Sequence, residues 1–248
     1  MNLRSVILMS FVVFIWWFIC SVCGISPLIL PSPLAVAMSV REELFGPNPL
    51  WFDLFSTTRR AVFAFFLAVG VGVPIGLLMG QYVGLRRALQ FLVDFFRSIP
   101  PIALFPLFIL SFGLGEISRI AVPFYGAVLI MIVSSMYGVL NAPSLRRQVG
   151  VVHGLSRVEV FWKIVFPDAI PHIVSGMRNA VSLCLVLVVV VEMFWGAPSG
   201  LGKRLFDAHL AFQSPRLYAV IFFIGILGYT LNLVLQLIEV RFLSWREK

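Results

Sequence analysis

Long runs of apolar residues without charge dominate the chain and decide what it can fold into. A helix needs about 20 apolar residues to cross a bilayer. With 60% hydrophobic and only 12% charged residues, the 248-residue chain is too apolar for a soluble domain. We therefore predict an all-α, polytopic membrane protein with six transmembrane helices. The predicted spans are residues 5–23, 60–80, 98–114, 120–140, 174–197 and 217–238.

The distribution of basic residues predicts the orientation. Six spans place both ends of the chain on one side. With the N-terminus inside, the inner segments hold twelve Arg and Lys residues and the outer segments hold seven, as the positive-inside rule requires. Both termini are therefore expected in the cytoplasm. The net charge of +8 is spread over short inter-span segments, which favours the lipid bilayer over nucleic acid as the partner.

The first span has an alternative interpretation as a secretory signal, because Arg4 precedes an apolar stretch. No small-x-small cleavage pattern follows it, which favours a retained helix. Cys20 and Cys23 have the spacing of redox or metal sites, but His and acidic partners are lacking nearby. The three His residues are scattered along the chain. We therefore predict no metal site and no disulfide.

Three domains are expected along the chain. Residues 1–24 form an N-terminal transmembrane helix, and residues 25–59 form an extracytoplasmic segment. The latter carries a surface helix at 34–44 that ends before Pro47-Asn48-Pro49. Residues 60–248 form the transmembrane core.

Glycines mark one face of the second span. Gly72, Gly76 and Gly80 are four residues apart, which favours close packing against another helix. The G-x-x-x-x-G-K-[ST] order of a phosphate-binding loop is missing, so this run is no nucleotide site.

The loop at 144–171 is charged and amphipathic, unlike the spans around it. Ser144 is predicted to cap a helix over 145–153, and Gly154 to end it in a left-handed conformation. A capping box from Ser156 to Glu159 then starts a second helix, which Pro167 ends, and Pro171 precedes the fifth span. The apolar face of the second helix is predicted to hold Val158, Phe161, Trp162, Val165 and Phe166.

Two interpretations of this loop remain. It can lie flat on the inner leaflet with its aromatic side chains among the headgroups, or it can project as a docking surface for another subunit. The order of cap, stop and cap favours a shaped projection.

Several motifs resemble those of one known family. The stretch 154–171, Gly-Leu-Ser-Arg…Lys-Ile-Val-Phe-Pro…Ala-Ile-Pro, is similar to the coupling-loop signature of permease subunits of bacterial ABC importers. The likeness continues through 176–180 and 190–202. Upstream, the segments 97–106 and 112–119 resemble the branch that includes nitrate, sulfonate, taurine and bicarbonate permeases. One departure is that Gln148-Val149-Gly150 stands where the family usually has Glu-Ala-Ala.

The resemblance implies a transport subunit of the bacterial inner membrane that is no enzyme and binds no cofactor. ATP and Mg²⁺ would belong to separate ABC ATPase subunits. A second permease copy, as in a homodimer, and an extracytoplasmic substrate-binding protein would complete the complex. The ATPase-docking loop would contain Arg147, Gln148, Val149, Gly150, His153, Gly154, Leu155, Ser156, Arg157, Glu159 and Pro167. A gating or structural role would fall to Glu192, Gly196, Gly200 and Gly202.

The resemblance further implies that the transported solute is a small anion, such as a sulfonate, nitrate, taurine or bicarbonate. The alternative is a permease for a neutral or aromatic vitamin or its precursor. A secondary transporter or channel is disfavoured because internal repeats are not found. An intramembrane enzyme would need several convergent reactive groups, and the spans offer only Glu192. That residue lies near the outer end of the fifth span, where solvent or the backbone would satisfy it.

Overall fold

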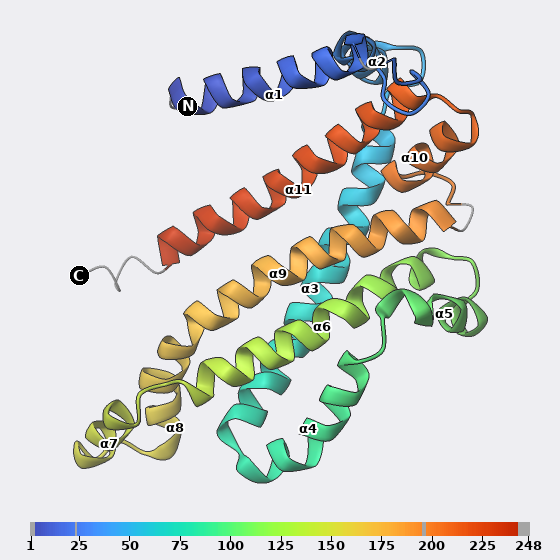
Figure 1. Cartoon of the computed structure of the whole chain (residues 1–248). Coiled ribbons are helices and arrows are strands. Elements are labelled where there is room, and N and C mark those ends of the chain that lie inside the picture. Colours follow the sequence, from blue (N-terminus) through green and yellow to red (C-terminus); the bar gives the residue numbers. More distant parts are fainter. Residues whose placement is uncertain (1–2, 23, 195–196, 243–248) are drawn as a thin grey trace. The chain divides into compact units, whose positions relative to one another are not determined.

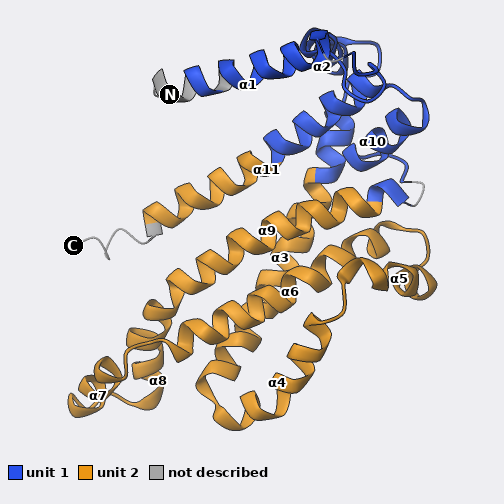
Figure 2. Ribbon diagram, in the orientation of Figure 1, with its two compact units in different colours: residues 1–57, 192–227 blue, residues 58–191, 228–248 orange. Residues whose placement is uncertain are grey.

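The computed structural model describes residues 3–22, 24–194 and 197–242, and these contain helices and no strands, as predicted (Figure 1). Its helices group into two compact units (Figure 2). Unit 1 consists of residues 1–57 and 192–227, and unit 2 of residues 58–191 and 228–248. Both units are therefore discontinuous in sequence. The helix bounds are α1 Leu3–Val22, α2 Pro33–Phe45, α3 Trp51–Gln81, α4 Val83–Arg97, η1 Pro101–Leu104, α5 Phe105–Phe112, α6 Glu116–Leu140, α7 Ser144–Val152, α8 Arg157–Val160, η2 Phe161–Val165, α9 Phe166–Phe194, α10 Leu201–Leu210 and α11 Ser214–Phe242.

Four helical stretches in the described part of the chain are long and apolar enough to cross a membrane. They are Trp51–Gln81, Glu116–Leu140, Arg157–Phe194 and Ser214–Arg241. A bent pair, Val83–Arg97 with Pro101–Phe112, raises the number to five if it counts as one span. The first helix contributes a shorter apolar stretch, Ser10–Val22. The predicted number of six is thus not reproduced by length and composition.

The third predicted span, 98–114, is wrong as a single straight helix. Pro100 and Pro101 separate α4 from the short η1 and α5, and the two parts meet at an angle of 87°. The cause is local, because proline lacks an N–H for the helical ladder and restricts the residue before it. Helix α4 was not predicted, because its charged and apolar residues alternate at helical spacing and leave no long charge-free run.

The core of unit 2 is built from α3, α6 and α9, which are brought together by glycines. The predicted glycine face of α3 packs against α6. A Cβ atom at Gly76 would lie 2.3 Å from the carbonyl oxygen of Ile132, and one at Gly80 would lie 2.5 Å from Cβ of Val139. On α9, Gly176 meets Ser134 of α6 in the same way. Figure 1 shows α6 and α9 running alongside each other. Close backbone approach of this kind is how membrane helices associate.

Unit 1 contains the predicted helix near 34–44, which is confirmed as α2. Ser32 caps its first turn, with the side chain accepting from the N–H of Ala35. Side chains of α1 and α11 donate hydrogen bonds to backbone carbonyls of the loop between α1 and α2. The indole of Trp16 donates to the carbonyl of Pro31 over 3.1 Å, and the hydroxyl of Tyr218 donates to that of Ile29 over 3.1 Å.

Candidate functional site

The hairpin of α7 and α8 in unit 2 has the predicted order of helix, stop and capped helix. The predicted cap by Ser144 is wrong, because α7 begins at Ser144 itself and no side chain caps its first turn. At the end of α7, Gly154 adopts φ +79°. Its N–H donates to Val151, and the N–H of Leu155 donates to Gly150 over 3.1 Å. These two bonds form a Schellman motif, in which a left-handed residue satisfies the last carbonyls of a helix. Glycine suits this position because it has no Cβ to oppose a positive φ.

The predicted capping box is confirmed two residues later. The hydroxyl of Ser156 accepts from the N–H of Glu159 over 3.3 Å, and the Glu159 carboxylate accepts from the N–H of Ser156 over 3.0 Å. Lys163 pairs with the same carboxylate at 2.9 Å. The Schellman motif, the capping box and the ion pair to Lys163 therefore stabilise the hairpin by contacts within the chain.

The second helix of the hairpin differs from the prediction after Val160. Residues Phe161–Val165 form a π-helical turn that leads directly into α9, so neither Pro167 nor Pro171 ends a helix. The wider turn changes the side-chain period, which also breaks up the expected apolar face. Val165 is buried, whereas Val158 and Trp162 are 66% and 57% exposed.

The hairpin therefore presents apolar side chains to its surroundings. Leu145, Val149 and Val152 of α7 are exposed, Val152 by 84%. Beside them lies a groove of about 460 Å³ between α7 and the π-helical turn. It is lined by Leu145, Arg146, Val149, Lys163, Ile164, Pro167 and Asp168.

The residues predicted for docking do not all face this surface. Gly150 is buried, and a Cβ there would lie 2.6 Å from Cδ1 of Ile164, so the smallest residue stands where α7 touches the π-helical turn. Arg147 turns back to donate to the carbonyl of Val139. The others lie in α7, the turn or α8 on the exposed or half-buried side: Gln148, Val149, His153, Gly154, Leu155, Ser156, Arg157 and Glu159.

Glu192 belongs to a different cluster, in unit 1. Its side chain is buried, with 1% of the residue exposed, and accepts from the Thr57 hydroxyl at 2.8 Å and the N–H of Gly202 at 3.0 Å. Of the two alternatives predicted for Glu192, solvent or a backbone partner, the structure has the backbone partner. Gly200 adjoins the carboxylate. Gly196 lies outside the described residues.

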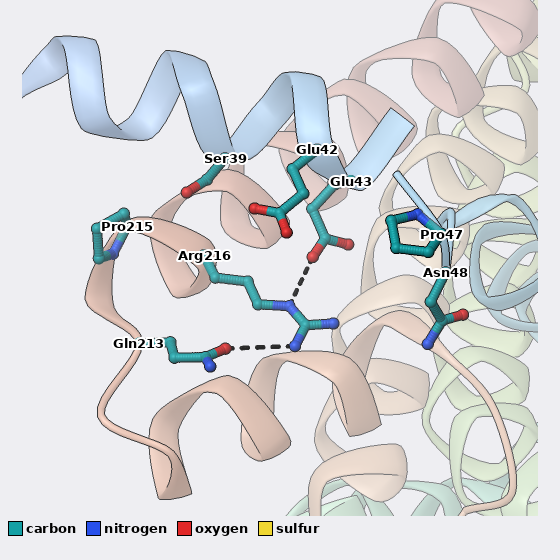
Figure 3. A pocket seen from close by; sticks show the side chains of 8 residues that line it. All are labelled: Ser39, Glu42, Glu43, Pro47, Asn48, Gln213, Pro215 and Arg216. Carbon is teal, nitrogen blue, oxygen red and sulfur yellow. Dashed lines mark hydrogen bonds and ion pairs between the residues drawn. The ribbon is translucent and has the colours of Figure 1, made fainter. Parts of the chain in front are cut away.

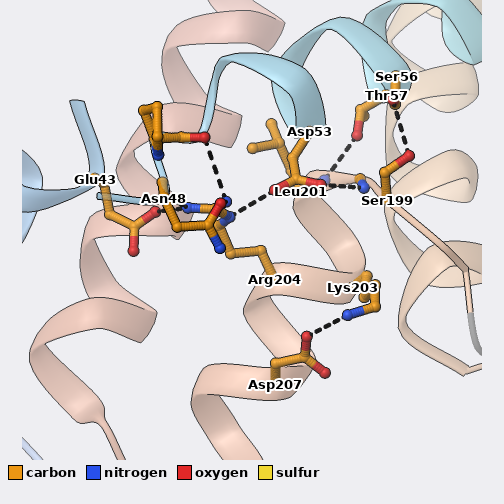
Figure 4. A network of polar contacts seen from close by, with 12 residues as sticks. Glu43, Asn48, Asp53, Ser56, Thr57, Ser199, Leu201, Lys203, Arg204 and Asp207 are labelled. Atoms are coloured by element: carbon orange, nitrogen blue, oxygen red, sulfur yellow. Dashed lines mark hydrogen bonds and ion pairs between the residues drawn. The ribbon is translucent and has the colours of Figure 1, made fainter. Parts of the chain in front are cut away.

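A charged network also lies in unit 1 (Figure 4). Arg204 of α10 donates to Glu43 of α2 at 2.5 Å and to Asp53 of α3 at 2.7 Å, and all three side chains are largely buried. Arg216 of α11 pairs with the other oxygen of Glu43 at 2.6 Å. Burial acts to lower the pKa of Arg204, but the hydrogen bonds and charges of Glu43 and Asp53 together outweigh it and the pKa is raised. The guanidinium is therefore charged at every physiological pH.

Two polar hollows border the network. One, of about 440 Å³, is lined by Ser39, Glu42, Glu43, Pro47, Asn48, Gln213, Pro215 and Arg216 (Figure 3). In it, Arg216 points to Glu43 and Gln213 (Figure 3). The other, of about 340 Å³, includes Lys203, Arg204 and Asp207.

Most of the basic residues of the predicted outer segments are in ion pairs within the chain. In unit 2, Glu116 accepts from Arg60 at 2.7 Å, Arg59 at 3.1 Å and Arg119 at 3.2 Å. Lys203 pairs with Asp207 at 2.6 Å in unit 1. Six of the seven basic residues counted for those segments are thus in ion pairs. Because these cations are already paired with carboxylates, the small excess of positive charge in the predicted outer segments is only weak support for the attraction of anions.

Among the described residues, no group of three or more His, Cys, Asp or Glu side chains has the arrangement of a metal site. Cys20 donates to the carbonyls of Leu30 and Pro31, and Cys184 is buried beside Pro123. The partner in the C-x-x-C spacing, Cys23, lies outside the described residues.

Comparison with known proteins joins these features to one family. The chain is 32% identical over 247 residues to a protein of Brucella abortus (strain 2308) described as a probable ABC transporter permease, covering 97% of this chain and 95% of the relative. It is 30% identical to the taurine transport system permease of Escherichia coli (strain K12), over 93% and 85% of the two chains. Among solved structures, a chain of the MetNI methionine ABC transporter shares the fold with a TM-score of 0.68. That match has 18% identity and covers 77% of this chain and 94% of the other. Residues 72–245 match the family described as binding-protein-dependent transport system inner membrane component, so the chain belongs to that family and is a permease subunit of an ABC importer.

Proposed function

We propose that the hairpin of α7 and α8 is the surface on which an ABC ATPase docks. The observation that carries this proposal is an exposed apolar patch on a hairpin that its own caps hold rigid. The side chains of Leu145, Val149 and Trp162 are exposed. Arg146 and Lys163 stand at the rim of the groove beside them. Both cations are already paired within the chain, with Asp168 and Glu159. The apolar side chains are therefore the part of this surface that an apolar cleft of a partner fits. ATP and Mg²⁺ then bind to the ATPase, and nucleotide-driven motion reaches the permease through the hairpin.

The assembly we propose contains two copies of this permease, two ATPases and an extracytoplasmic binding protein. The dependence on a binding protein follows the family description. Two identical copies are the simplest arrangement, because most oligomers of one chain close with two-fold symmetry. Both termini face the cytoplasm in this scheme, on the same side as the hairpin, because the inner segments hold more basic residues.

The topology can be tested by cysteine labelling. In a variant without the native cysteines, a cysteine at His153 or Lys163 is expected to react with an impermeant thiol reagent only after the cells are opened. One at Asp207 is expected to react in intact cells. All three positions are open to solvent. Labelling of position 153 in intact cells would refute both the orientation and the docking role.

For the solute, we propose a small anion such as a sulfonate, taurine, nitrate or bicarbonate. The support is the taurine transport system permease among the relatives, which is similar over 93% of this chain. The paired state of Lys203, Arg204 and Arg216 argues against a permanent anion site at the residues of unit 1. Selectivity therefore belongs mainly to the binding protein.

A ligand screen on the cognate binding protein tests this proposal. We expect an anion of this class to raise its melting temperature and to be taken up by vesicles that contain the whole complex and ATP. Uptake of a neutral vitamin or its precursor, without competition from any anion, would contradict the solute class and leave the family assignment intact.

A further inference from the structure

Helix α4 of unit 2 carries a polar stripe, although it is half of the bent pair that counts as a candidate membrane span. The stripe consists of Arg86, Gln90, Asp94 and Arg97, which follow each other at intervals of four, four and three residues. That spacing places them along one side of a helix. All four residues are exposed or half-buried, whereas Val93 on the neighbouring side is buried against the core of unit 2. The polar stripe therefore lies outside the packed core of unit 2.

The remaining exposed side of α4 is apolar. Phe91 and Phe95 are exposed by 75% and 52%, and their spacing of four residues places them on a side of their own. The helix thus has one side suited to hydrocarbon and one suited to water. An amphipathic helix of this kind can lie flat on a membrane surface, or it can stand within the membrane beside a water-filled space.

Contacts with α6 decide between these two arrangements. The hydroxyl of Tyr125 donates to the carbonyl of Phe96 over 2.7 Å, and a Cβ atom on Gly126 would lie 3.2 Å from Cγ of Pro101. Tyr125 and Gly126 lie near the middle of the 25 residues of α6, so the end of α4 is level with the middle of a span and α4 does not lie flat. Arg97 directly precedes the predicted third span and was expected on the inner side. It lies instead near the mid-height of α6.

Asp94 and Arg97 form only a loose ion pair. Their side chains are 57% and 49% exposed, and 3.8 Å separates the carboxylate oxygen from the guanidinium nitrogen, which is longer than a hydrogen bond. Charged side chains within a membrane are costly in hydrocarbon and face the interior of a bundle or a water-filled cavity. The N–H groups of Arg97 are therefore open to a solute that passes along the stripe.

We infer that the polar stripe of α4 lines the path of the solute through the membrane, and that Arg97 is the cation that the solute contacts near mid-height. A guanidinium fits the oxygen atoms of a sulfonate, nitrate or bicarbonate, because its N–H groups donate in pairs. Asp94 competes for the same N–H groups, so an anion is held only briefly, as conduction requires. The role of Arg97 rests on the proposed function in taking the solute to be an anion, whereas the aqueous side of α4 does not.

Thiol labelling of the permease, freed of its native cysteines and purified with its ATPase in nanodiscs, tests the aqueous side. Gln90→Cys places a thiol on the polar stripe, and Phe91→Cys places one at almost the same depth on the apolar side. We expect a water-soluble methanethiosulfonate to react about tenfold faster or more at position 90 than at position 91, because the reactive thiolate needs water. Both variants leave Arg97 in place. Equal rates at the two positions, with and without ATP, would show that lipid or a second copy covers the stripe, and would overturn the inference.

The charge of the reagent tests Arg97 without knowledge of the solute. Two methanethiosulfonates are compared in Gln90→Cys, one bearing a sulfonate and one a trimethylammonium group, each relative to its rate with a free thiol in solution. Arg97→Gln is expected to lower the ratio of the sulfonate rate to the ammonium rate about fourfold, since the reagents differ by two charges and Arg97 lies about 10 Å from position 90 along the helix. The control Arg97→Lys keeps the charge and is expected to keep the ratio. An unchanged ratio in Arg97→Gln would overturn the role of Arg97.

Failure of this inference can be told apart from failure of the proposed solute class. If the binding protein binds an anion and Arg97→Gln leaves the ratio unchanged, the solute class stands and the role of Arg97 is wrong. If the binding protein binds only a neutral solute while position 90 still reacts faster than position 91, the contact at Arg97 is wrong and the aqueous side of α4 stands.

Discussion

Replacing Gly154 by valine is expected to abolish most ATP-driven uptake while the permease remains in the membrane. Nothing lies within 4 Å of a Cβ placed on Gly154, so the cost is conformational and involves no clash. A β-branched residue at φ +79° is strained by about 1–2 kcal/mol. Relief of that strain requires loss of the two bonds that end α7 and hence a change in the angle of the hairpin. We expect uptake to fall about tenfold or more.

Asparagine provides the matched control for Gly154, because it tolerates the left-handed conformation better than other residues with a side chain. Gly154→Asn is expected to retain most of the uptake. The measurements are uptake into proteoliposomes, ATPase activity with the loaded binding protein, and copurification of the ATPase. Normal uptake and normal stimulation in Gly154→Val would rule out the coupling role of this turn.

The second large effect is expected at Gly76 in α3. An alanine there places Cβ 2.3 Å from the carbonyl oxygen of Ile132 and 2.7 Å from Cβ of Ser135. Backbone atoms cannot rotate away as the end of a side chain can, so α3 and α6 must separate. Overpacking of this kind costs about 1–3 kcal/mol. We expect a clear fall in the melting temperature of the protein in detergent.

The control for Gly76 lies six residues earlier in the same helix. A Cβ atom at Gly70 meets nothing within 4 Å, so Gly70→Ala is expected to leave the melting temperature unchanged or slightly raised, because alanine is the better helix former. Equal melting temperatures for the two variants would show that α3 and α6 do not pack through this face.

Local signals account for most of what the sequence predicted correctly. The left-handed Gly154 and the capping box at Ser156 depend on residues within a few positions of each other, so their chemistry can be read from the sequence. The glycine face of α3 follows from helical period in the same way. No local sequence pattern predicted the π-helical turn at Phe161–Val165. This turn leads directly into α9, so the helix continues through Pro167 and Pro171.

Contacts between residues that are far apart in the chain could not be predicted from the sequence. Thr57 and Glu192 are 135 positions apart, and nothing near Glu192 in the sequence shows which hydroxyl would face it. Arg204 and Glu43 fall in segments predicted to lie outside the membrane, and the structure buries both. Their pairing depends on which helices unit 1 brings together, which a single sequence does not encode in any local pattern.

The ion pairs of unit 1 also impose an order on biogenesis. Glu43 and Asp53 leave the ribosome 161 and 151 residues before Arg204, the cation that they share in the finished protein. A carboxylate without its cation is too costly to bury, so both must stay hydrated until α10 has been synthesised and has reached the same side of the membrane. Unit 1 is therefore completed late, and a nascent chain that stalls before residue 204 leaves exposed two acidic side chains that the finished protein buries or half-buries.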